Sequence, residues 1–293
     1  MLTQNASAIF LPEETAETTT YLFNSGSCKY DTEMSRQLAV KQAIRTMRTR
    51  FQDPLTLSEI ADSAQLSAFH FNRIFRNIVG VPPSVYLAAL RIEQAKKLLL
   101  RTTLSVTSIC FDVGYNSLGT FTTRFTQFVG ANPTHLRRLC QDKELSTFFR
   151  DWEHLKNNLG VLQCSREKSA IRGYIDVSQP FDGLIFVGAF RDPIPQGTPI
   201  GCTILAGSGD YAITTLPQGK YYLFAAAFQR SDDFIQMLEG SASQRYADQH
   251  PISIYQEDIQ NTVYIKLLPM SWTDPPILTA LPLLLMLRLR QYS

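Results

Sequence analysis

Apolar residues recur at helical spacing in two stretches of the chain, and the two stretches match each other. In the first, Phe71, Ile74, Phe75 and Ile78 are three or four positions apart, which is typical of one buried helix face. Six positions of this stretch recur at an offset of 50 (117 − 67), namely Ser67, Phe71, Phe75, Val79, Gly80 and Pro83. Ile60 matches Ile109 at an offset of 49 (109 − 60), so the second copy has one more residue in its turn. The chain therefore contains an internal helical repeat.

Each copy predicts a short helix, a turn and a second helix. Thr56 and Glu59 have the spacing of a capping box at the start of the first helix. Ser67, and Ser117 in the second copy, are suited to cap the helix that follows the turn. Gly80 then ends that helix. The polar and basic residues left on its outer face suit a DNA major groove.

Longer sequence segments within this region carry a family resemblance. They are SEIADSAQLS, FHFNRIFR, GVPPSVYLAALRIEQAKKLL, SICFDVGYNSLGTF and TRFTQFVGANP. The region from about Leu38 to Arg138 resembles the DNA-binding domain of the AraC/XylS family of bacterial transcription regulators. The resemblance implies seven helices, two of them recognition helices that enter successive major-groove segments of double-stranded DNA. It also implies transcriptional control, often activation through contact with RNA polymerase.

Charge supports a nucleic-acid partner for this region. Residues 34–141 hold 14 Lys/Arg and 5 Asp/Glu, a net charge of +9, whereas the flanking segments carry −4 and −3. A basic block joined to mildly acidic flanks fits a phosphate-contacting domain beside a domain that does not bind DNA. The alternative is a solvated basic surface, which the repeat makes the weaker interpretation.

The resemblance assigns contacts to named positions of the two recognition helices. The base-facing candidates are Ala68, Phe69, Asn72, Arg73, Leu118, Gly119, Thr122 and Thr123. The candidates for phosphate contact and register are Ser67, Arg76, Ser117 and Arg124. Phe69 could instead cover a neighbouring helix, and Arg76 fits a phosphate better than a base.

The two copies differ where base contacts are expected. Thr123 stands where the first copy has Arg73, and Arg124 is displaced by one residue, about 100° around a helix. Arginine is the commonest reader of guanine, whereas threonine offers a hydroxyl or a methyl group. We therefore expect the first copy, through Arg73 and Asn72, to carry most base discrimination.

Two further helices frame the repeat. One is predicted from Ser35, with Val40, Ile44 and Met47 on its buried face. The other, Ser84 to Leu100, joins the copies, and its roughly 17 residues span about 25 Å. That length suits two recognition helices near the roughly 34 Å spacing of successive major grooves. Arg91 in this helix is expected to pair inside the domain rather than to contact bases.

The C-terminal half changes to short runs of β-branched and aromatic residues bounded by turn residues. These runs are 183–190, 209–216, 219–228 and 261–268, and they predict an antiparallel β-sandwich. The segment LPQGKYYLFAAAF weakly resembles transthyretin-like and carboxypeptidase-regulatory-like sandwiches. The fold class is thus an all-α double helix-turn-helix domain followed by an all-β domain. The aromatic residues of the predicted sandwich are better suited to fill its core than to line a ligand groove. They are Tyr211, Tyr221, Tyr222, Phe224 and Phe228.

The expected organisation has four parts. They are an N-terminal arm (1–34), the DNA-binding domain (35–140, with helix-turn-helix units at 57–78 and 105–128), a linker with an amphipathic helix (141–168) and the β-sandwich (169–293). The sandwich could sense a small-molecule effector or form a homodimer. The apolar tail from Ile277 suits either cover for a sheet face or a contact between protomers.

Candidate chemistry is sparse. The five cysteines are scattered without a C-x-x-C pair, and the four histidines lie far apart outside any known catalytic or zinc motif. We expect no enzyme activity, no cofactor and no metal. The apolar run 278–289 is too short to span a bilayer, and the start of the chain lacks the pattern of a signal peptide. These features predict a cytoplasmic, sequence-specific DNA-binding regulator, with non-specific DNA binding as the alternative.

Overall fold

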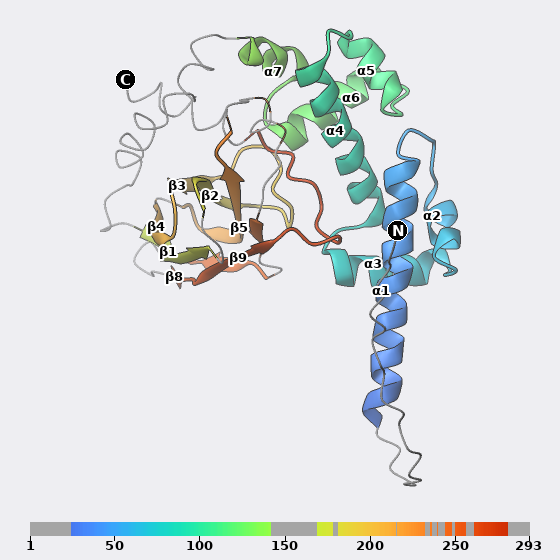
Figure 1. Ribbon diagram of the computed structural model, residues 1–293, viewed down its shortest axis with the longest axis horizontal. Helices are drawn as coiled ribbons and strands as arrows, with labels where there is room; N and C mark the ends of the chain where they lie inside the picture. The colour runs from blue at the N-terminus through green and yellow to red at the C-terminus, as the bar shows by residue number, and fades with distance from the viewer. Residues whose placement is uncertain are drawn as a thin grey trace, which may run out of the picture.

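The fold was obtained as a computed structural model that describes residues 25–141, 169–177, 181–214, 216–231, 235, 239, 244–247, 250–255 and 261–280. Within them, seven helices precede nine strands (Figure 1). The helices are α1 (Ser25–Thr49), α2 (Leu57–Ser63), α3 (Ala68–Val79), α4 (Pro83–Arg101), α5 (Val106–Asp112), α6 (Leu118–Val129) and α7 (Pro133–Cys140). The strands are β1 (Ser169–Val177), β2 (Gly183–Phe190), β3 (Gly201–Leu205), β4 (Gly209–Thr214), β5 (Gly219–Gln229), β6 (Gln244–Ala247), β7 (Ile252–Ile254), β8 (Asn261–Thr262) and β9 (Ile265–Pro269). The predicted order, all-α followed by all-β, is confirmed.

The repeat folds as two helix-turn-helix units, α2–α3 and α5–α6. Thr56 and Glu59 form the expected capping box at the start of α2. Ser117 caps α6 by accepting a hydrogen bond from the Thr120 amide. Ser67 occupies the N-cap position of α3, but its side chain makes no capping hydrogen bond, so that prediction was wrong. The backbone of Ser67 has φ −65° and ψ 147°, close to that of Ser105, whose side chain does cap α5, so the missing bond at α3 does not follow from the cap backbone.

The first helix starts earlier than the sequence indicates. Helix α1 begins at Ser25, ten residues before the predicted start at Ser35 (35 − 25), so residues 25–34 are helical. Its buried face begins only at Val40 and continues through Ile44 and Met47, whereas Leu38 is exposed. The N-terminal part of α1 therefore extends away from the rest of the molecule, as Figure 1 shows. An apolar pattern marks only those turns of a helix that pack against other residues, so it could not show where this helix begins.

The strands form one curved sheet rather than two separate layers. Its order is β3-β2-β5-β6-β9-β1-β4, and the two end strands, β3 and β4, contact each other, so that the sheet nearly closes into a barrel. Most neighbours are antiparallel, as predicted, but β1 runs parallel to β8 and β9. The interior is an apolar cluster that includes Ile175, Val187 and Leu223. We call residues 169–280 the β-domain.

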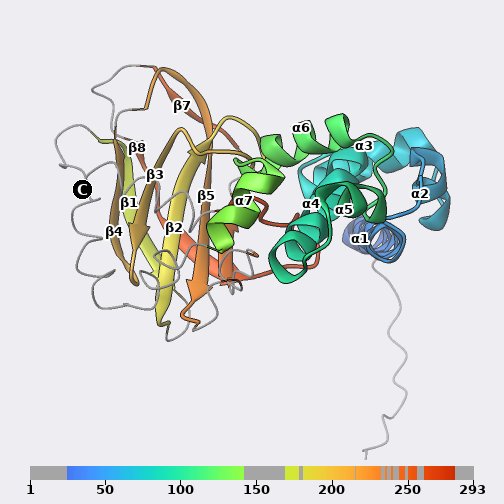
Figure 2. The same ribbon diagram turned by 90° about the horizontal axis from the view of Figure 1, so that it is seen from above.

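The helical domain and the outer face of the sheet share a second apolar core. This cluster runs without interruption from α1–α7 to Leu184, Phe186 and Phe228 on β2 and β5. Figure 2 shows the helices stacked along one side of the sheet, with α6 and α7 nearest to it. The two domains therefore pack as one unit, rather than being separate bodies on a linker.

Besides the ion pair between Arg101 of α4 and Glu239, two segments of the β-domain contact the helical domain through hydrogen bonds. The loop 193–199 places the Gly197 amide 2.9 Å from the Phe128 carbonyl at the end of α6. The segment 275–280 contacts the next residue of α6, with the Ala280 amide 3.3 Å from the Val129 carbonyl. Lys96 of α4, fully buried, donates to the Ile277 and Leu278 carbonyls at 3.2 Å each. We call these the loop 193–199 and the strap 275–280.

The apolar tail thus begins in the core that the two domains share. Ile277, Leu278 and Ala280 of the strap are buried in this shared core. The remainder of the tail, the N-terminal residues 1–24 and the predicted amphipathic helix after Gln141 lie outside the described residues. Among the residues that are described, none of the helices has the length and apolar character needed to cross a membrane.

Candidate nucleic-acid interface

Helix α3 presents its predicted base-facing side to solvent. Phe69 is 82% exposed, which excludes the alternative that it covers a neighbouring helix within the described structure. Arg73 and Arg76 are also exposed, while Ala68 and Asn72 are half-buried. Neither arginine makes a hydrogen bond or an ion pair with another described residue, so both guanidinium groups are available to a ligand. The opposite side of α3, with Phe71 and Phe75, is fully buried.

Helix α6, like α3, buries an apolar side and exposes the opposite side, but its exposed residues differ in chemistry from those of α3. Leu118, Gly119 and Thr123 are exposed and Thr122 is half-buried, whereas Phe121 is fully buried. The exposed surface near its start therefore offers hydroxyl and methyl groups. Its arginine, Arg124, is exposed and lies near the Tyr115 hydroxyl. The structure thus leaves all of the predicted contact residues at least partly accessible.

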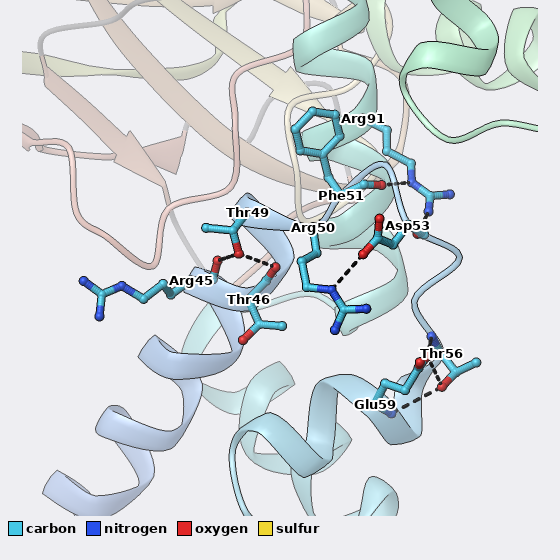
Figure 3. Close-up of polar contacts among 9 residues, drawn as sticks. All are labelled: Arg45, Thr46, Thr49, Arg50, Phe51, Asp53, Thr56, Glu59 and Arg91. Carbon is cyan, nitrogen blue, oxygen red and sulfur yellow. Dashed lines mark hydrogen bonds and ion pairs between the residues drawn. The ribbon is translucent and has the colours of Figure 1, made fainter.

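Arg91 joins the loop before the first helix-turn-helix unit to the second unit, as expected of a structural arginine. Figure 3 shows its guanidinium reaching the loop after α1, where Nε donates to the Phe51 carbonyl and a terminal nitrogen to the Asp53 carbonyl, both at 2.7 Å. The same guanidinium lies 5.8 Å from the centre of the Tyr115 ring, which belongs to the second unit. Burial lowers the pKa of Arg91, opposed by the nearby Tyr115. This arginine therefore positions the units and is unavailable to bases.

The backbone makes a second contact between this loop and the second unit. Gly114, in the turn of the second unit, has φ +84°, and a Cβ built there would lie 2.5 Å from the Gln52 carbonyl oxygen. Only glycine permits both this conformation and this approach. Sequence reasoning found the extra residue in the second turn but not the role of this glycine, because its partner is 62 positions away (114 − 52).

Helix α4 sets the distance between the units. It contains 19 residues and spans about 28 Å, slightly longer than the sequence predicts. Pro83 at its first turn is well placed because its missing amide would have no helical partner there. In Figure 1, α4 runs from the first unit to the second. A single chain therefore carries the two helix-turn-helix units at the two ends of α4.

A groove beside α6 adds polar residues that sequence reasoning missed. It is lined by Thr122 together with Asn132, His135 and Arg138 from the start of α7. Asn132 caps α7 by accepting from the His135 amide at 2.8 Å. Arg138 is exposed. These residues belong to the same basic block, and the Asn-Pro pair at the start of α7 was the available signal. In the described residues no group of three or more His, Cys, Asp or Glu side chains could hold a metal ion.

Comparison with known proteins agrees with this geometry. The helix-turn-helix domain family matches residues 60–139. The melibiose operon regulatory protein of Escherichia coli K12 is 27% identical over 124 residues, 42% of this chain and 41% of that protein. The transcriptional activator AarP of Providencia stuartii is 35% identical over 83 residues, 28% of this chain and 62% of that protein. The bifunctional transcriptional activator/DNA repair enzyme AdaA of Bacillus subtilis is 31% identical over 94 residues, 32% of this chain and 44% of that protein.

The fold and its two exposed helices define a double helix-turn-helix protein. More narrowly, residues 60–139 form a helix-turn-helix domain of the AraC type, and the relatives of the chain are regulators of the AraC/XylS family. The chain spans less than two thirds of the length of each of these three relatives. The predicted family resemblance is confirmed for the helical domain.

Proposed function

We propose that this protein is a sequence-specific DNA-binding transcription regulator that contacts two successive major-groove segments with α3 and α6. The observation that carries this proposal is the repeat itself. Two capped helix-turn-helix units, joined by α4 and fixed by Arg91, expose equivalent helix faces on a block with a net charge of +9. The family match supports the same function.

Base discrimination is assigned mainly to α3. Arg73 can donate two hydrogen bonds to a guanine, and Asn72 can pair with an adenine edge. Helix α6 contributes contacts from Thr122 and Thr123 that discriminate less. Arg76, Arg124 and the serines Ser67 and Ser117 fix the register through phosphates. Ser67 is suited to this because its hydroxyl is not used for capping.

The names of the relatives favour activation over repression. AarP and AdaA are both named as transcriptional activators, and activation in this family often involves RNA polymerase. A purely regulatory role, without catalysis, agrees with the names of the melibiose regulator and AarP. AdaA is also named as a DNA repair enzyme, but the cysteines of this chain are not clustered as those of a fused repair enzyme would have to be.

Selection from random DNA, followed by sequencing of the retained pool, tests the proposal. Wild type is compared with Arg73→Ala and with Thr123→Ala at two salt concentrations. We expect an enriched motif with two subsites about one helical turn apart. Arg73→Ala should lose information at one base position, at a cost of about 1–3 kcal/mol there, whereas Thr123→Ala should change the other subsite less.

The same experiment separates the alternatives. Salt-sensitive retention without an enriched motif would replace the proposal with non-specific phosphate binding. A motif that keeps its full information in Arg73→Ala would place base discrimination elsewhere. A motif twice the expected length would indicate that two chains bind together.

A further inference from the structure

The ends of the two recognition helices meet the β-domain differently, although the repeat makes these ends equivalent. At the end of α6 the loop 193–199 packs closely, because the Gly197 amide donates to the Phe128 carbonyl. A Cβ built on Gly130 would lie 3.2 Å from the Gly197 backbone. The position equivalent to Phe128 at the end of α3 is Ile78 (128 − 50), and among the described residues no backbone donor of the β-domain reaches its carbonyl.

An open cleft occupies the place where such a contact would be. Its volume is about 350 Å³, and one wall is formed by the last turn of α3 with Ile78, Val79 and Gly80. A Cβ built on Gly80 would meet nothing within 4 Å, in contrast to Gly130. The other wall belongs to β6, β9 and residues 271–275 of the β-domain. The cleft is therefore shared by the first recognition helix and the β-domain, and its volume suits a small molecule.

The polar groups of the β-domain wall favour an acidic ligand. Arg245 and Lys266 both line the cleft. Arg245 is buried, donates to the Pro275 carbonyl at 2.9 Å and lies 3.7 Å from the Asp274 carboxylate, which also accepts from the Ser271 amide. Asp274 is thus engaged, whereas Lys266 is exposed and has no ion pair or hydrogen bond with a described residue. The cleft therefore presents the ammonium group of Lys266, whose cross-strand neighbour on β1 is Asp176.

The opposite wall favours a hydrogen-bond donor. The end of a helix carries unpaired carbonyl groups and a partial negative charge. Ile78 and Val79 add apolar surface on this side, and Leu268 and Pro269 add it on the other. A ligand that satisfies both walls has an acidic group, a hydroxyl or amine donor, and a small apolar body between them.

We propose that this cleft binds a small organic acid that also carries a hydrogen-bond donor, and that binding fixes α3 against the β-domain as the loop 193–199 already fixes α6. The coupling half of this inference depends on the proposed DNA-binding function, whereas ligand binding does not. Fixing both helices would pre-organise them for successive grooves. Occupancy of the cleft should therefore increase affinity for DNA.

Fluorescence of Trp272 measures binding directly, without DNA. Trp272 lies between two residues that line the cleft, Ser271 and Thr273, and Trp152→Phe would remove the other tryptophan of the chain. The probe is 3-phenyllactate, with 3-phenylpropanoate lacking the hydroxyl and methyl 3-phenyllactate lacking the acid. From its size we expect saturable binding of 3-phenyllactate with a dissociation constant of about 1 mM or lower. Each comparison compound should bind at least about fivefold more weakly.

Three variants locate the site in the full-length Trp152→Phe protein. Lys266→Met should weaken binding about tenfold, because it removes the ammonium group. Lys220→Met is the matched control, since Lys220 is an exposed lysine of β5 outside the cleft, and it should leave binding unchanged. Ala247→Phe places a ring in the cleft from an exposed position and should abolish binding while the protein stays folded by circular dichroism.

The outcomes separate the two halves of the inference. No saturable change up to about 10 mM 3-phenyllactate, or binding that is insensitive to both Lys266→Met and Ala247→Phe, would overturn the ligand site. With the selected DNA motif, we expect the probe to raise affinity about fivefold in wild type and not in Ala247→Phe. Ligand binding without any change in DNA affinity would overturn the coupling. A protein that selects no motif would refute the proposed function and leave the fluorescence result standing.

Discussion

Lys96 provides a quantitative test of how the two domains are joined. Its ammonium group is fully buried and, among the residues that the structure describes, donates to the Ile277 and Leu278 carbonyls of the strap 275–280. Burial lowers its pKa from 10.5 to about 8, with smaller opposing contributions led by Glu93. A neutral amine still has two N–H donors, so it can keep both hydrogen bonds without the cost of burying a charge.

The sign and size of the effect follow from the two pKa values. The folded protein releases the proton of Lys96 near pH 8 and the unfolded chain near pH 10.5, so between these values the unfolded chain binds more protons. The free energy of unfolding should therefore rise with pH through this window. At about 1.36 kcal/mol per pKa unit the full change is about 3 kcal/mol, and about 2 kcal/mol of it falls between pH 8 and pH 10.

Urea unfolding of wild type and Lys96→Met at several pH values measures this change. Methionine has a similar length and no charge, so the contribution of every other titrating group, including the buried Tyr86 with its raised pKa, appears in both proteins. The stability difference, wild type minus variant, should grow by about 2 kcal/mol from pH 8 to pH 10. Parallel pH profiles, with the difference constant to within about 0.5 kcal/mol, would refute a buried charge at this contact.

Three further comparisons between variants test the contacts and caps of the helical domain by thermal or urea unfolding. Gly114→Ala should lower the free energy of unfolding by about 3 kcal/mol or more, because it combines positive φ with a clash at the Gln52 carbonyl. Gly80→Ala should lower it by only about 1–2 kcal/mol, from φ strain. Equal losses in the two variants would contradict the close contact between Gly114 and Gln52. Ser117→Ala should lose about 1 kcal/mol and Ser67→Ala less than about 0.5 kcal/mol, since only Ser117 makes a capping bond. Arg91→Met should cost about 2–3 kcal/mol by leaving two carbonyls without their donor, and rescue by Arg91→Lys would argue against the two-pronged contact.

Local sequence signals predicted the helical domain well. The capping box at Thr56, the glycine that ends α3 and the apolar spacing of Phe71 and Phe75 all act within a few residues, and each is present in the structure. Arg91 was also correctly placed inside the domain, although its carbonyl partners could not be named from sequence. The exposed faces of α3 and α6 followed from the same periodicity, because the buried side of a helix defines the opposite side.

The contacts between distant segments could not be predicted. The sequence pattern indicates no role for Lys96, and nothing near it in sequence indicates that its partners are Ile277 and Leu278, 181 and 182 residues away. The short strands β6 and β7 were missed for a related reason, because runs of four and three residues carry too little alternation to stand out. Arg245, which lines the cleft, lies on one of these strands.

The asymmetry between the two units connects these observations. The groups proposed to read bases most selectively, Arg73 and Asn72, lie on the helix whose last turn lines an open cleft. The threonines proposed to read less selectively lie on the helix that the loop 193–199 contacts. A ligand that acted on α6 would find its end occupied, and it would change the less selective half of the site. A ligand in the cleft beside Gly80 would act on the half of the site that is proposed to be more selective. Control and discrimination are therefore expected to converge on α3.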